Sequence, residues 1–170
     1  MRWISSSGGP LVLLPSSIQE RWSGAVRTPS GTVSDYDAAC AVRGYVGTIL
    51  RHSRSILVLN DEPMDTTTIR MGPRHAVFAR WIYGPSRAVV EEDLRHLTLP
   101  AAAELEQLAF TASERLYGLI DSAELGASAA ECERIELVPG DYIVRVLEHA
   151  PRRDTKLILC DARSAPGHSS

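Results

Sequence analysis

The chain has 170 residues, of which 44% are hydrophobic and 23% are charged, and these are ordinary proportions for a folded globular protein. They exclude a chain that is disordered throughout, and the length suffices for a single domain with an apolar core. The formal net charge of -3 provides no field that would draw the chain onto nucleic acid or an anionic membrane, so neither is expected as a partner.

The chain begins with short segments typical of strands, which small residues separate. Branched and aromatic residues predict strands over 2–5 and 11–14, which the turn at residues 8–10 would join as a tight hairpin. Serine hydroxyls after a proline predict a short helix over 16–22, and a further helical turn is expected at 38–40. The first 40 residues are therefore expected to alternate brief strands and brief helices.

The middle of the chain carries stronger signals. Segments 45–50 and 55–59 flank a polar turn and form the clearest hairpin. Residues 60–73 are expected to leave the sheet as a loop, because this segment contains a proline that lacks a backbone donor. A strand over 75–83 and a helix over 86–96 follow, the helix with its apolar residues on one face.

The remainder of the chain is rich in strand signals. Five strands are predicted, over 104–110, 117–120, 134–138, 141–147 and 156–160. The sequence therefore predicts an α+β fold with mostly antiparallel sheets and a few short helices. We expect two lobes within one domain, covering 1–97 and 98–163, and a disordered tail over 164–170.

No run approaches the roughly 20 apolar residues that cross a bilayer, and the apolar stretch 11–14 is too short for a signal peptide. A cytoplasmic location is therefore expected. Cys40, Cys132 and Cys160 are odd in number and lack the short spacing of metal or redox sites. We predict three reduced thiols, no metal and no cofactor.

Cys40 and a histidine would supply the residue types of a cysteine hydrolase. The small apolar segment 38–42 around this cysteine would raise the pKa of its thiol, which favours a structural role over catalysis. We therefore expect that the protein is not an enzyme.

Acidic residues gather in two loops, and they lack the alternating ligands and glycine of a calcium site. A solvated acidic face is the simplest interpretation, and a face that binds a partner is the second. The candidate partner-binding residues are Asp35, Asp37, Asp61, Glu62 and Asp65.

Four segments, 3–15, 22–24, 35–40 and 57–63, combine turn residues, tryptophans and a helix start in one order and spacing, and 81–83 extends the set. Read together they resemble the immunity protein 21 family of bacterial polymorphic toxin systems, over roughly residues 2 to 97. Asn60 departs from the family pattern, which has a glycine there. The residues that carry the motifs are Trp3, Gly8, Gly9, Pro10, Trp22, Gly24, Tyr36, Cys40, Pro63 and Trp81.

The resemblance implies a protein that binds and blocks a cognate toxin, usually encoded beside it, with no reaction of its own. The acidic loops would then face a basic cleft of the toxin and steer the encounter. A structural or regulatory binding domain is the alternative from another class, and the neighbouring genes would distinguish the two.

Overall fold

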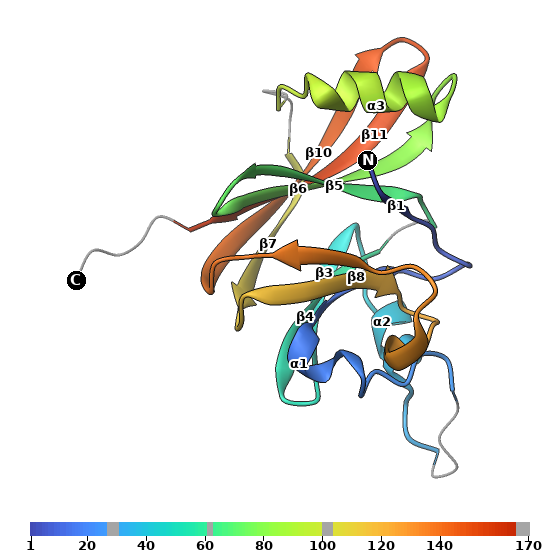
Figure 1. Cartoon of the computed structure of the whole chain (residues 1–170), viewed down its shortest axis with the longest axis vertical. Coiled ribbons are helices and arrows are strands. Elements are labelled where there is room, and N and C mark those ends of the chain that lie inside the picture. Colours follow the sequence, from blue (N-terminus) through green and yellow to red (C-terminus); the bar gives the residue numbers. More distant parts are fainter. Residues whose placement is uncertain (27–30, 61–62, 100–103, 166–170) are drawn as a thin grey trace, which may run out of the picture.

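The computed structural model describes residues 1–26, 31–60, 63–99 and 104–165. Two antiparallel sheets pack face to face, and helices lie on the outer face of each sheet (Figure 1). This strand-rich α+β arrangement agrees with the fold class that the sequence predicts. No helix within those ranges is long and apolar enough to cross a membrane.

The larger sheet has six strands, all paired antiparallel. In spatial order they are β1 (Trp3–Ile4), β5 (Thr66–Gly72), β6 (His75–Tyr83), β11 (Thr155–Ser164), β10 (Gly140–Arg152) and β7 (Glu104–Ala112). The smaller sheet has five strands, in the order β3 (Val46–Arg51), β4 (Arg54–Leu59), β2 (Leu11–Pro15), β8 (Leu116–Asp121) and β9 (Glu133–Glu136).

The helices are short and cover the sheets from outside (Figure 1). Helix α3 (Arg87–Arg95) lies over the six-stranded sheet, and its N-terminal cap is the hydroxyl of Ser86. Helices α1 (Ser16–Gln19) and α2 (Asp35–Cys40) lie on the five-stranded sheet, followed later by the 3-10 turn η1 (Gly126–Ser128).

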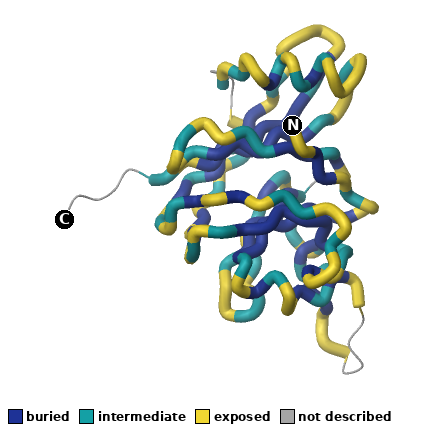
Figure 2. The backbone as a smooth tube through the Cα atoms, viewed as in Figure 1, coloured by how far each residue is buried: buried dark blue, intermediate teal, exposed yellow. Residues whose placement is uncertain are grey.

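The side chains of each central strand alternate between two apolar cores. In β11, Ile158 and Cys160 face the core between the sheets, whereas Leu157 and Leu159 face α3. A strand that is covered on both faces typically has a continuous run of apolar residues. Burial on both faces therefore explains why residues 157–160 are all apolar. Figure 2 shows this burial through the middle of both sheets.

Most predicted elements are confirmed. The hairpin of β3 and β4, the strand β6, the helix α3 and the five later strands all form where the sequence places them, with boundaries that differ by a few residues. The α2 turn also forms, and it begins at Asp35, earlier than predicted.

Two predictions about the first sheet strands are wrong. The expected hairpin of 2–5 and 11–14 does not form, because β1 pairs with β5 in one sheet and β2 pairs with β4 and β8 in the other. The segment between them crosses from sheet to sheet. The predicted loop 60–73 contains β5, whose branched residues pair with β6, and its residues 61–62 lie outside the described part of the chain.

The division into two lobes at residue 98 is not confirmed. Each sheet contains strands from both sides of that position, and β11 pairs with β6 on one edge and with β10 on the other. The predicted disordered tail falls mostly on residues 166–170, which lie outside the described residues.

Replacement of Leu13 by alanine tests the core between the sheets. Leu13 is 0% exposed, so Leu13→Ala should lower the free energy of unfolding by about 2–5 kcal/mol through lost burial and a residual cavity. The control Leu50→Ala removes a leucine that is 75% exposed and should change it by less than about 0.5 kcal/mol. Chemical denaturation measures both, and equal losses would contradict the assignment of the core.

Candidate functional site

Asp35, one of the predicted partner-binding residues, lies in the interior and is 1% exposed. Its carboxylate accepts hydrogen bonds from the backbone N–H of Ser23 at 2.8 Å and from Arg51 Nε at 2.6 Å, and lies 3.0 Å from His52 Nε2. Burial by itself would raise the pKa of Asp35, but the hydrogen bonds from Ser23, His52 and Arg51 outweigh it and hold that pKa below its ordinary value. Asp35 therefore ties α2 to the tip of the β3–β4 hairpin.

Asp37 is exposed and also caps α2. Its Oδ2 accepts from the backbone N–H of Ser34 at 3.3 Å, and Ser34 Oγ accepts from the backbone N–H of Asp37 at 3.0 Å. This reciprocal pair is a capping box. Since these bonds use only Oδ2, the second oxygen of Asp37 has no hydrogen-bond partner among the described residues.

The other predicted acidic residues belong to a different region. Asp65 is half-buried and its Oδ2 lies 2.9 Å from an Arg87 nitrogen, whereas Asp61 and Glu62 lie outside the described residues. The β3–β4 tip that binds Asp35 and the end of β4 that leads into residue 60 are separated by the six residues of that strand, a length of about 20 Å. Asp35 is thus bound at the end of β4 opposite to the one that leads into residue 60.

Several motif residues meet at one end of the five-stranded sheet. The ring of Tyr36 packs against Gly9, where a Cβ atom would come within 2.5 Å of it. Trp22 Nε1 donates to the carbonyl of Ser122 at 3.0 Å, and Asp121 Oδ2 accepts from the backbone N–H of Ser7 at 2.7 Å. These contacts hold the 6–10 turn against α2 and the end of β8.

Gly24 belongs to the same cluster and has two reasons to be glycine. Its φ of +57° is a conformation that other residues rarely adopt, and a Cβ atom there would lie 2.5 Å from the carbonyl oxygen of Glu124. The cluster formed by Gly9, Trp22, Gly24, Tyr36 and their partners is therefore a packing device that shapes the surface around it.

The remaining motif tryptophans lie on the other side of the molecule, beneath α3. The rings of Trp3 and Trp81 are 5.9 Å apart, and Trp3 Nε1 donates to Glu91 of α3 at 2.8 Å. The guanidinium of Arg87 lies 5.6 Å above the Trp3 ring. These contacts fix α3 on the six-stranded sheet, and Pro63 is exposed in the segment before β5.

All three cysteines are free. Cys160 is buried, and burial raises the pKa of its thiol to about 12. Cys40 is half-buried and its hydrogen bond to Tyr36 raises the pKa of that phenol. Within the described ranges no cysteine forms a hydrogen bond with a histidine. Three histidines lie within hydrogen-bond distance of a carboxylate: His52, His75 and His96.

The sequence did not single out a buried carboxylate on the six-stranded sheet. Asp161 is completely buried, and its oxygens lie 2.6 Å from His75 Nε2, 2.6 Å from an Arg145 nitrogen and 3.0 Å from Arg163 Nε. Burial opposes ionisation, yet the hydrogen bonds from Arg145, His75 and Arg163 hold the pKa of Asp161 below its ordinary value. The pairing of Arg145 opposite Asp161 in the β10–β11 register was the available signal.

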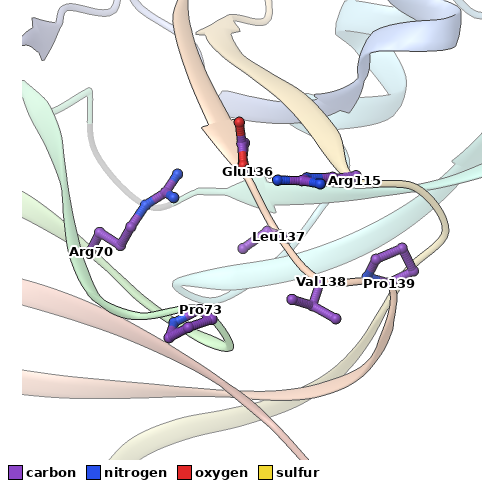
Figure 3. Close-up of a pocket in the computed structure, with 7 residues that line it drawn as sticks. All are labelled: Arg70, Pro73, Arg115, Glu136, Leu137, Val138 and Pro139. Carbon is purple, nitrogen blue, oxygen red and sulfur yellow. Dashed lines mark hydrogen bonds and ion pairs between the residues drawn. The ribbon is translucent and has the colours of Figure 1, made fainter.

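A groove of about 480 Å³ opens between the two sheets (Figure 3). Arg70 and the turn at Pro73 line it from the six-stranded sheet, and the end of β9 with the segment after it lines the opposite side. Arg115 and Glu136 form an exposed ion pair of 3.0 Å at its rim. The groove residues are Arg70, Pro73, Arg115, Glu136, Leu137, Val138 and Pro139.

Among the residues that the structure describes, no three His, Cys, Asp or Glu side chains are grouped so as to hold a metal ion. The described residues therefore show two charged features: the buried carboxylates of Asp35 and Asp161, which are bound by side chains of the protein itself, and a groove bordered by arginines.

Comparison with known families identifies a match. The family model described as Immunity protein 21 matches residues 2–155 of the 170-residue chain, beyond the first 97 residues on which the motifs lie. No curated protein and no solved structure matches the chain.

Replacement of Asp161 by asparagine tests its role as an internal anchor. Because the pKa of Asp161 is lowered in the folded chain, its stabilisation is present above the unfolded pKa of about 3.9 and is lost as the pH falls through the folded value. Asp161→Asn should lower the free energy of unfolding at pH 7 by about 3–5 kcal/mol. It should also make that free energy fall less steeply as the pH is lowered. Denaturation at pH 3 to 7 measures the free energy of unfolding, with Glu20→Gln at an exposed position as the control. If the variant loses stability below pH 4 as steeply as the wild type, Asp161 is not such an anchor.

Proposed function

The chain belongs to the immunity protein 21 family, and on that premise we propose that it binds a cognate protein toxin and blocks it by covering the toxin's surface, without catalysis. The observation that carries this proposal is the family match over residues 2–155. A cytoplasmic location forms part of the proposal.

The architecture supports a binding role. An inhibitor gains affinity when its surface is preformed, because less conformational entropy is then lost on association. Here both faces of the central strands are covered by packed side chains, so the edges and loops stand on a rigid framework. The cysteine hydrolase alternative loses support, because no described cysteine bonds a histidine, Cys40 contacts Tyr36, and His52 and His75 contact carboxylates.

We propose that acidic side chains contribute to the toxin contact through their exposed members. Asp37 is exposed and keeps one free oxygen, whereas the carboxylate of Asp35 is engaged by Arg51 and His52. In this proposal Asp37 forms one acidic contact, and Asp65, with Asp61 and Glu62 before it in the sequence, forms a second one. Exposed charges of this kind mainly set the rate of encounter.

The toxin encoded by the neighbouring gene provides the direct test of function. We expect the purified chain to form a stable complex with that toxin in size-exclusion chromatography and titration calorimetry, and its co-expression to restore growth of cells that make the toxin. A toxin from an unrelated family serves as the control. Absence of both binding and protection would reject the proposed function.

Substitution of Asp37 separates its charge from its capping role. Asp37→Asn retains an acceptor for the capping box, and Asp37→Lys reverses the charge, so association with the toxin should slow by about threefold to tenfold in the reversal and less in the neutral variant. The loss should fade in high salt, because surface charges are then screened. Stopped-flow kinetics measures this, with the exposed Glu20→Lys as control.

If Asp37 acts only as a cap, both variants should bind at the wild-type rate. Any effect would then appear in the free energy of unfolding, by up to about 1 kcal/mol in Asp37→Lys, because the helix loses a cap acceptor. Unchanged association rates in Asp37→Lys would therefore remove Asp37 from the binding surface while the immunity function stands.

A further inference from the structure

The groove between the sheets is bordered by two strand edges that lack complete partners. β9 is the last strand of the five-stranded sheet. On the other side, β1 pairs only with Thr66 and Thr67 of β5, so residues 68–72 have no strand beyond them among the described residues. Such edges offer unpaired backbone N–H and C=O groups to an added strand.

Side chains connect the two edges at one end of the groove. Glu133 of β9 lies 2.8 Å from the hydroxyl of Thr68 in β5, across the space between the sheets. Burial raises the pKa of Glu133 above its ordinary value, and the hydrogen bond from Thr68 opposes that shift. A small pocket of about 90 Å³ lies at this contact, and the groove of about 480 Å³ is lined by Pro73 and Pro139.

Arg70 lines the groove, and Arg134 lies beside it in a smaller pocket that both arginines line. Arg70 and Arg134 are both exposed, and neither guanidinium has a hydrogen-bond or ion-pair partner among the described residues. Arg115 adds a third guanidinium, whose partner Glu136 is the exposed carboxylate at the rim. The floor between these charges is apolar and includes Leu137, Val138 and the two prolines.

We propose that this groove receives an extended segment of the toxin that carries acidic side chains and adds as a strand to the edge of β9. This inference rests on the proposed function, because the occupant is the same toxin. The unpaired edge supplies backbone hydrogen bonds, and Arg70 in the groove and Arg134 in the smaller pocket beside it pair with carboxylates of the added strand. The apolar floor receives the small apolar side chains between them.

A simpler role for the same residues is protection of the edge. A strand of four residues with three charged side chains, followed by a proline, is also a way to prevent uncontrolled pairing with other chains. In that role the edge needs charged side chains of either sign. Reversal of the charge of the arginines would then leave toxin binding unchanged. The sign of the charge is therefore the property to test.

The experiment uses the full chain and the toxin encoded by the neighbouring gene. Arg70→Glu and Arg134→Glu, alone and combined, should weaken toxin binding in calorimetry, by about tenfold or more in the double variant. The matched control is Arg153→Glu, which reverses an exposed arginine in the β10–β11 turn and should change Kd by less than about twofold. Melting temperatures should match the wild type, because neither groove arginine has a partner to lose.

Hydrogen exchange supplies a readout that depends on the backbone. In the complex, the amides of residues 68–72 and Glu133–Glu136 should exchange more slowly than in the free chain, as expected when a strand adds to an edge. Wild-type affinity in the double variant, or unchanged exchange at both edges, would overturn the docking proposal while the immunity function stands.

The remaining outcomes are also decisive. If the wild-type chain fails to bind the toxin, the proposed function and this inference fall together. If the free chain forms dimers by sedimentation, and the dimers dissociate in the double variant, the groove receives a second copy of the chain and the toxin-docking proposal is overturned.

Discussion

The structure depends on burial of both faces of its two sheets. In β2 every residue is buried, and in β11 the run from Leu157 to Ala162 is buried as well, so each sheet needs cover on its outer side. Helix α3 provides that cover for the six-stranded sheet, and α1 and α2 provide it for the five-stranded sheet. Tryptophans and glycines of the sequence motifs help to hold these covering segments in place; examples are Trp22, Gly24 and Trp3.

Buried carboxylates hold together segments that are far apart in sequence. Asp35 joins α2 to the β3–β4 hairpin, and Asp161 joins the ends of β6, β10 and β11. In both cases hydrogen bonds outweigh the cost of burial and lower the pKa of the carboxyl: they come from Ser23, His52 and Arg51 at Asp35, and from Arg145, His75 and Arg163 at Asp161. Carboxylates that are buried and bound in this way cannot contact a partner protein. A partner therefore contacts the charges that remain exposed.

The exposed charges lie on distinct parts of the molecule and differ in sign. Asp37 belongs to the layer over the five-stranded sheet, whereas Arg70 and Arg134 border the groove between the sheets. In the proposed complex, two contacts of opposite sign would fix the orientation of the toxin and oppose partners with another charge pattern. The covered faces between these contacts would supply rigidity, which limits the entropy lost on binding.

The sequence by itself determined the elements whose signals are local. The β3–β4 hairpin, α3 with its cap at Ser86 and the later strands follow from turn residues, capping and periodicity, and the motifs sufficed to indicate the family. Tertiary structure alone decided which strands pair: β1 and β2 separate into different sheets, and β5 forms because β6 is beside it. It also decided that Asp35 is buried, that Asp161 meets His75 and Arg145, and that the β5 and β9 edges border one groove. These outcomes depend on contacts between residues tens of positions apart, and local periodicity carries no information about such partners.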